Sequence, residues 1–172
     1  MRALVFLFVA VGSFVGFVIF LIVLAPLWLT HQPRPTAQQP IDFNHAIHVQ
    51  TAGLQCDFCH RTTADSSSAG LPDVQQCMDC HQVVAPTNSE VEKLRQAWLQ
   101  QQPVDWLRVH QLPDHVHFTH EAHIQAGVSC ATCHGDVGNM AHVTQVRALN
   151  MSDCVSCHQQ NNAPTECGAC HY

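Results

Sequence analysis

The stretch Cys56-Asp57-Phe58-Cys59-His60 is the first of five Cys-x-x-Cys-His motifs in this chain of 172 residues. In such a motif the two thiols add across the vinyl groups of one haem, and the histidine ligates its iron. The attachment residues would be Cys56, Cys59, Cys77, Cys80, Cys130, Cys133, Cys154, Cys157, Cys167 and Cys170. The proximal iron ligands would be His60, His81, His134, His158 and His171. The sequence therefore predicts five covalently attached haem c groups.

Zinc ribbons and disulfide frameworks also use cysteine pairs. A zinc ribbon takes its pairs two at a time, and five is an odd number. A disulfide framework gives no reason for a histidine after every second cysteine. Because the five motifs use all ten cysteines, haem attachment is the better interpretation.

Chain length limits the fold. Beyond residue 29 fewer than about 30 residues remain for each haem, too few for an ordinary apolar core. We therefore expect a multihaem cytochrome c fold in which the haems form the core and the chain is mostly irregular with short α-helices. The net charge of −6 argues against nucleic acid as a partner.

The amino-terminal segment resembles a membrane anchor. Ala3–Leu29 carries no charged residue, and as a helix it would be about 40 Å long against a hydrocarbon core of roughly 30 Å. A cleaved signal peptide would have a shorter apolar stretch ending in small residues, whereas Pro26-Leu27-Trp28-Leu29 continues the run. We expect residues 1–29 to form a transmembrane anchor helix.

A proline-rich spacer, residues 30–41, follows and leads into a haem domain, residues 42–172. Haem c is attached on the outer, oxidising side of the membrane. We therefore expect the protein in the cell inner (cytoplasmic) membrane, with its amino terminus cytoplasmic and its haem domain periplasmic or extracytoplasmic.

The haem domain repeats itself. Phe43-Asn44-His45-Ala46-Ile47-His48 precedes the first motif, and Phe118-Thr119-His120-Glu121-Ala122-His123 precedes the third at an offset of about 75 residues. The offset predicts two similar dihaem modules, residues 42–88 and 117–160, with a fifth haem at residues 161–172. In the connector, residues 89–116, Ser89-Glu90-Val91-Glu92 predicts a capping box that opens a helix.

Each low-spin iron needs a distal ligand. Histidines at i and i+3 project to the same side of a helical turn and can reach two adjacent haems. The repeated elements therefore predict His45, His48, His120 and His123 as distal ligands. For the fifth place the candidates are His110, His142, Met140, Met151 and His31. The alternation of His115 and His117 with apolar residues fits a short strand with surface histidines.

Several stretches resemble the pentahaem subunit of alternative complex III. The resemblance covers Phe43–His171 and is most specific from Val104-Asp105-Trp106-Leu107-Arg108-Val109-His110 to Cys133-His134-Gly135-Asp136-Val137-Gly138-Asn139-Met140. It implies Met140 as the fifth distal ligand, with His110 next. The sequence departs from the family at His115 and His117, where tyrosines are expected, and this argues against a ligand role for both. It also departs at His142, where the family tends to be aliphatic, so His142 ranks lower as a ligand.

The same resemblance implies a subunit of a quinol-oxidising respiratory or photosynthetic membrane complex. Its expected partners are integral-membrane and iron–sulfur subunits, the lipid bilayer, and a monohaem cytochrome or other acceptor that takes the electrons. No catalysis is expected on this chain alone.

Two other functions deserve comparison. A small membrane-anchored quinol dehydrogenase would contact quinol directly, but the spacer lifts the first haem away and no Cys-x-x-Cys-His-x-x-Met occurs. A nitrite-type reductase often has a lysine as proximal ligand, and the single lysine, Lys93, follows no cysteine pair.

Overall fold

The computed structural model describes residues 2–26 and 38–172. The chain divides into two compact units, Met1–Pro35 and Thr36–Tyr172. Residues 27–37, which include most of the predicted spacer, the end of the predicted anchor and the candidate ligand His31, lie outside the described residues.

The amino-terminal unit contains helix α1 (Arg2–Ile19), which continues as the π-helical segment η1 (Phe20–Leu24). Many of its described large apolar side chains are exposed, including Phe8 and Ile22 at 74% and 70% of their full accessible area. Within the described residues, no helix combines the length and apolarity required for a membrane span.

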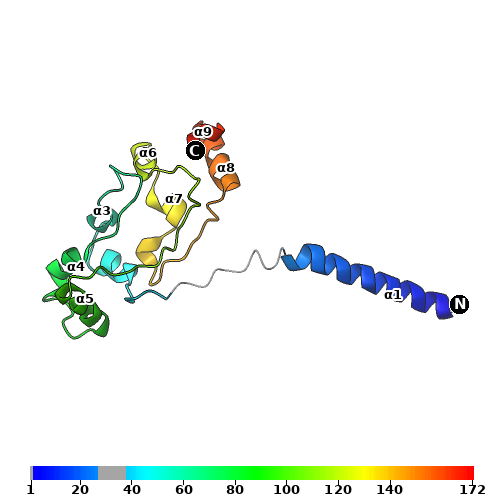
Figure 1. Ribbon diagram of the computed structural model, residues 1–172, viewed down its shortest axis with the longest axis horizontal. Coiled ribbons are helices and arrows are strands. Elements are labelled where there is room, and N and C mark those ends of the chain that lie inside the picture. Colours follow the sequence, from blue (N-terminus) through cyan, green and yellow to red (C-terminus); the bar gives the residue numbers. More distant parts are fainter. Residues whose placement is uncertain (1, 27–37) are drawn as a thin grey trace. The chain divides into compact units, whose positions relative to one another are not determined.

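The haem domain consists of short helices joined by irregular segments (Figure 1). They are η2 (Ile47–Thr51), α3 (Cys56–Cys59), α4 (Val74–His81), α5 (Ser89–Leu99), α6 (His120–Gln125), α7 (Cys130–His134), η3 (Val137–Asn139), α8 (Met151–Gln160) and α9 (Cys167–Cys170). Among residues 38–172 the sheet-type pairing is an isolated antiparallel bridge between Val116 and His171. This confirms the expectation of mostly short helices.

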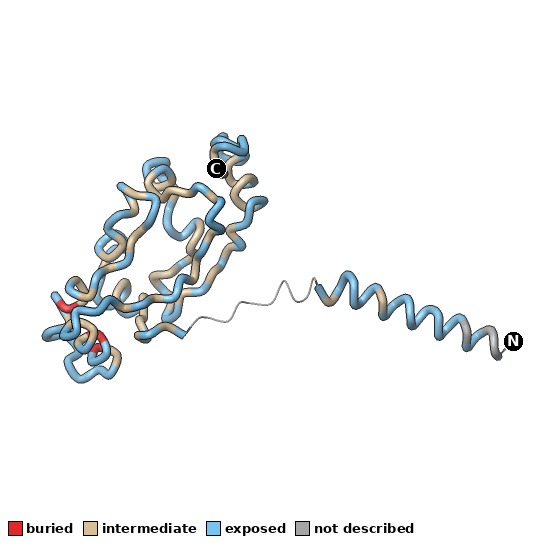
Figure 2. Tube along the Cα trace, viewed as in Figure 1, coloured by how far each residue is buried: buried red, intermediate tan, exposed pale blue. Residues whose placement is uncertain are grey.

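The polypeptide itself has a very small core. In the described part of the chain, only Met78, Val91 and Leu94 are buried hydrophobic residues. They belong to α4 and α5, which pack together at one end of the domain (Figure 2). Such a small apolar core agrees with the expectation that haem groups form the interior of this domain.

Helix α5 forms where the connector pattern predicted it, but its cap differs. The Asn88 side chain accepts a hydrogen bond from the Glu90 backbone N–H at 2.8 Å. Ser89 is therefore the first helical residue and not the cap. Asparagine is a strong N-cap residue, because its side-chain oxygen accepts from a backbone N–H that the helix leaves free.

The repeat is visible in the local geometry. The Phe43 ring lies 4.7 Å from the His45 ring at 84°, and the Phe118 ring lies 4.9 Å from the His120 ring at 87°. The first module has one residue more than the second between its second histidine and the following glycine. In the first module this segment is the π-helical η2, whereas the matching segment of the second module is the α-helical α6. A π-helical turn accommodates one extra residue, so it preserves the match between modules.

Candidate haem-binding sites

Every Cys-x-x-Cys pair lies on one helical turn. The pairs are in α3, α4, α7, α8 and α9. Residues at i and i+3 share a helix face, so the two thiols of each pair lie on the same side. All ten cysteines are free, and each is at least partly accessible. This is the arrangement that two thioether bonds to one haem require.

Hydrogen bonds fix the ring orientation of seven histidines. In each, Nδ1 lies near a backbone carbonyl oxygen, at 2.8 Å for His48, His60, His120 and His123, 3.2 Å for His81 and His171, and 2.5 Å for His158. A ligating histidine typically donates from its other ring nitrogen in this way. Nε2 is then free to bind iron.

Three histidine pairs have the ring spacing that would allow both members to hold one iron. A metal–nitrogen bond of about 2 Å places the centroids of two rings on opposite sides of one metal roughly 6 Å apart. The ring centroids of His48 and His81 are 6.0 Å apart. Those of His120 and His134 are 6.3 Å apart, and those of His123 and His158 are 6.0 Å apart.

His45 faces the remaining motif of the first module. Burial, and to a smaller extent the neighbouring rings of His60 and His48, lowers its pKa to about 4. Its buried Nδ1 has no hydrogen-bond partner. A neutral imidazole is the form that binds a metal. The predicted distal histidines therefore each lie beside a proximal histidine, and the residues fit the haem groups.

Met140 and His110 both lie at the third motif. The Met140 methyl carbon is 3.3 Å from the position that a Cβ on Gly135 would occupy, directly after His134. The His110 ring meets the His134 ring edge-on with centroids 4.4 Å apart, too close for two ligands of one iron. Burial lowers the pKa of His110, and its Nε2 has no partner.

Two other candidates for the fifth place, His142 and Met151, are at the surface. His142 pairs with Asp42 at 3.3 Å, and its side chain is 64% exposed. Met151, at the start of α8, is 68% exposed.

His115 and His117 do not form the expected strand. His115 lies in a turn that Val116 closes by donating from its N–H to the Pro113 carbonyl at 2.9 Å. The His117 ring packs on Tyr172, whereas the His115 ring faces the proximal His171.

The motifs follow one another in space in an order that differs from the sequence. Burial raises the pKa of Cys77 and of Cys56, and a neighbouring thiol, Cys59 and Cys130 respectively, raises it further. The same two causes act on Cys154, where Cys170 is among the neighbouring thiols.

Cys133 of the third motif likewise has its pKa raised by burial, and Cys157 of the fourth motif is among its neighbouring thiols. Figure 1 shows the motif-bearing helices in the order α4, α3, α7, α8, α9, so the spatial order of the motifs is second, first, third, fourth, fifth. Helix α4 stands at one end and α9 at the other (Figure 1). Haem c supplies reversible one-electron chemistry when bound, and this order places the sites in single file.

Comparison with known proteins decides the family. A curated relative, the multiheme cytochrome c subunit of menaquinone reductase from Nitratidesulfovibrio vulgaris, is 30% identical over 161 residues, covering 78% of this chain and 77% of its own length. The class III cytochrome c family model matches residues 29–111. The chain is a multihaem class III cytochrome c. Its carboxyl-terminal part also matches the family of cytochrome c7 and related cytochromes c, over residues 116–172.

A cytochrome c3 from Desulfuromonas acetoxidans is similar to a shorter part of the cytochrome. The two are 37% identical over 57 residues, which is 33% of this chain and 79% of the relative. The cytochrome thus has a c3/c7-type fold with several covalent haems, and its ten cysteines in five pairs are consistent with five.

A polar loop, residues 62–70, supports two haem sites in the cytochrome. The Ser67 carbonyl accepts from both the backbone N–H and Nδ1 of His120, at 3.3 and 2.8 Å. The Gly70 carbonyl lies 2.8 Å from Nδ1 of His60. Sequence reasoning missed this role, because a carbonyl contact across 53 residues leaves no mark in side-chain identity.

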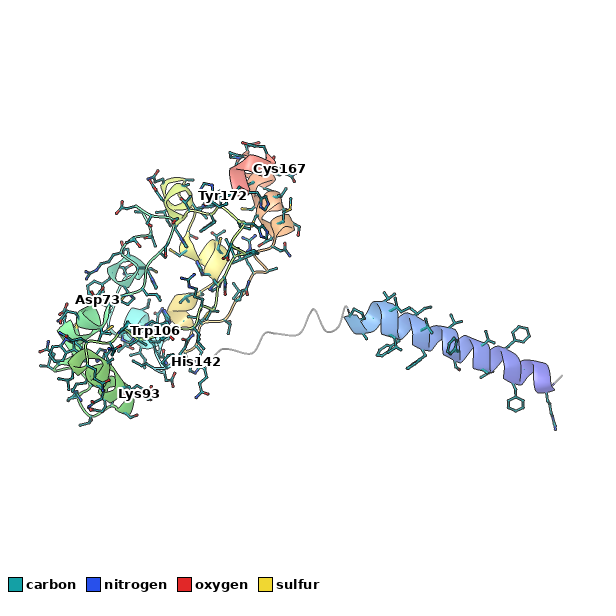
Figure 3. The ribbon with its side chains drawn as sticks, viewed as in Figure 1. Asp73, Lys93, Trp106, His142, Cys167 and Tyr172 are labelled. Carbon is teal, nitrogen blue, oxygen red and sulfur yellow. The ribbon has the colours of Figure 1, made fainter. Side chains whose placement is uncertain are left out.

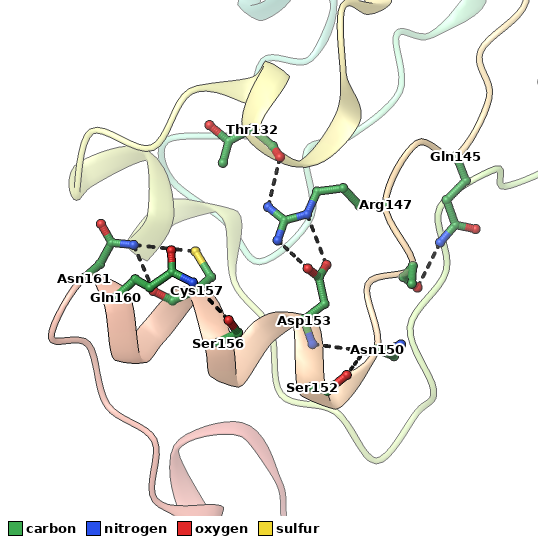
Figure 4. Close-up of polar contacts among 11 residues, drawn as sticks. Thr132, Gln145, Arg147, Asn150, Ser152, Asp153, Ser156, Cys157, Gln160 and Asn161 are labelled. Atoms are coloured by element: carbon green, nitrogen blue, oxygen red, sulfur yellow. Dashed lines mark hydrogen bonds and ion pairs between the residues drawn. The ribbon is translucent and has the colours of Figure 1, made fainter.

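Arg147 joins the third and fourth motifs (Figure 4). Its guanidinium donates to both carboxylate oxygens of Asp153 in α8 and, at 3.0 Å, to the Thr132 carbonyl in α7. The hydrogen bond to Asp153 raises the pKa of Arg147. A planar guanidinium suits this forked arrangement, in which one side chain fixes the spacing of two haem-bearing helices.

Proposed function

We propose that this cytochrome is the electron-relay subunit of a quinone-linked membrane complex and performs no catalysis alone. The single-file order of the five motifs carries the proposal. An end-to-end series of one-electron sites suits transfer between partners that dock at opposite ends of the domain. Each of four proximal histidines has a second histidine beside it. This supports six-coordinate irons, which transfer electrons and leave no position open for a substrate.

The amino-terminal segment would hold the cytochrome at the bilayer. We propose that residues 1–29 span the cell inner membrane with the amino terminus in the cytoplasm and the haem domain outside. The uncharged run Ala3–Leu29 supports this, as do the exposed apolar side chains of α1 and η1.

The proposed direction is quinol oxidation. The resemblance to alternative complex III favours electron entry from an iron–sulfur partner and exit to a monohaem cytochrome or other acceptor. A second candidate runs the other way. The relative that covers most of this chain belongs to a menaquinone reductase by name, which favours electron delivery toward the quinone.

Purification of the native assembly tests the proposal. A carboxyl-terminal affinity tag on the full chain, followed by mild solubilisation of membranes, should recover integral-membrane and iron–sulfur proteins with the cytochrome. The assembly should reduce its haems with menaquinol, whereas the haem-loaded cytochrome alone should not. Recovery of the cytochrome alone, reduced directly by menaquinol, would instead support the membrane-anchored quinol dehydrogenase.

The same assembly separates the two directions. Stopped-flow measurements would compare haem reduction by menaquinol with haem oxidation by added menaquinone after prereduction. Faster reduction by menaquinol supports quinol oxidation, and faster oxidation by menaquinone supports the second candidate.

A further inference from the structure

We propose that His115 is the distal ligand of the haem attached through Cys167 and Cys170. The His115 and His171 ring centroids are 5.6 Å apart with an angle of 20° between the planes. The three other measured distal–proximal pairs have centroids 6.0 to 6.3 Å apart. The ring spacing between His115 and the fifth proximal histidine is therefore close to the spacing in the predicted distal–proximal pairs.

The backbone holds this pair in place. Val116 forms an antiparallel bridge with His171, and the His117 N–H donates to the Cys170 carbonyl at 2.7 Å. Nδ1 of His171 lies 3.2 Å from the His115 carbonyl oxygen. The segment that carries the distal candidate thus also orients the proximal ring, since a hydrogen bond at Nδ1 leaves Nε2 free for iron.

The turn explains why His115, and not His117, faces the site. On a regular strand residues two apart share a face, so the sequence pattern treats both histidines alike. His115 precedes the single bridged residue and lies within the turn Pro113–Val116. The His117 ring instead packs on Tyr172, with centroids 5.3 Å apart.

Three rival candidates, Met140, His110 and His142, lie elsewhere. Met140 and His110 contact residues of the third motif, where His134 already faces His120. His142 lies far from Cys167 and Tyr172, which are together at one end of the domain (Figure 3). The geometry thus favours His115 over Met140, the ligand that the family resemblance implied.

The assignment changes the expected redox asymmetry. Methionine as an axial ligand raises the potential of a c-type haem. With His115 in the fifth place every iron has two histidine ligands. The fifth haem then has no thioether to set its potential above the others.

Spectroscopy of the full, haem-loaded chain tests the proposal. His115→Ala should convert one haem in five from low-spin to high-spin in the ferric EPR spectrum, and that haem should bind carbon monoxide when reduced. His117→Ala is the matched control and should leave all haems low-spin. His115→Met should restore six-coordination and introduce a thioether-to-iron band in the near infrared.

Three results would overturn the proposal. One is a near-infrared thioether band in the unaltered cytochrome, a reading that needs no variant to fold. The second is a His115→Ala protein with all its haems attached and low-spin. The third is a new high-spin haem in Met140→Ala.

Discussion

At the scale of single residues, His45 and His120 occupy matching places. Each stands edge-on to the phenylalanine two positions before it, and each lies beside a proximal histidine. His45→Ala and His120→Ala should therefore each produce one high-spin ferric haem in the EPR spectrum while the thioether bonds keep all haems attached. His142→Ala, at an exposed ion pair, is the control. Unchanged spectra in either distal variant would show that the modules are not equivalent.

At the scale of elements, the loop of residues 62–70 depends on Gly70. Its φ is +71°, and an added Cβ would lie 2.7 Å from Oγ1 of Thr62. Gly127 has φ +79° with open space around it. Both alanine variants should lose about 1–2 kcal/mol from left-handed backbone strain. In denaturant unfolding, the free energy of unfolding should fall further for Gly70→Ala than for Gly127→Ala, because only the Cβ at position 70 meets Thr62. Gly70→Ala should also alter the spectra of the haems on His60 and His120. Equal losses with unchanged spectra would contradict the proposed role of the loop.

The Arg147 link between α7 and α8 makes a second prediction at this scale. Arg147→Ala should lower the free energy of unfolding by roughly 1.5–3 kcal/mol, the usual range for hydrogen bonds to charged groups. Arg147→Lys should recover only part of this, because lysine lacks the planar fork. Lys93→Ala removes an ion pair with Glu90 within α5, where the lysine side chain is 54% exposed, and should cost under about 0.5 kcal/mol. A similar loss in the Arg147 and Lys93 variants would show that the link adds no stability.

The sequence predicts elements best where a covalent or periodic pattern dictates them. The Cys-x-x-Cys spacing implies a helical turn, and the repeated histidines imply distal partners that the ring geometry supports. The sequence could not predict the spatial order of the motifs or the position of His115. Both depend on backbone contacts between distant segments. The alternation of histidines with apolar residues predicts a strand at His115, because the same alternation occurs whether the backbone is extended or turns.

At the scale of the whole molecule, the two compact units predict separable roles. Replacing residues 1–35 by a cleavable export signal should release a soluble domain, Thr36–Tyr172, with its full complement of haems. The haem motifs and the candidate ligands that the structure brings together all lie within that unit. Haem content per polypeptide, measured by mass spectrometry, provides the test. Incomplete loading of the exported domain would show that the amino-terminal unit is part of the haem scaffold.

The relay proposal rests on five six-coordinate haem irons arranged in single file. The most direct test is to count low-spin and high-spin haems by EPR. Quantitative EPR of the oxidised, full-length cytochrome should show five low-spin ferric haems per chain and no spectral change on addition of cyanide or nitrite. A stoichiometric high-spin haem that binds either anion would contradict the relay and indicate an enzyme with an open iron.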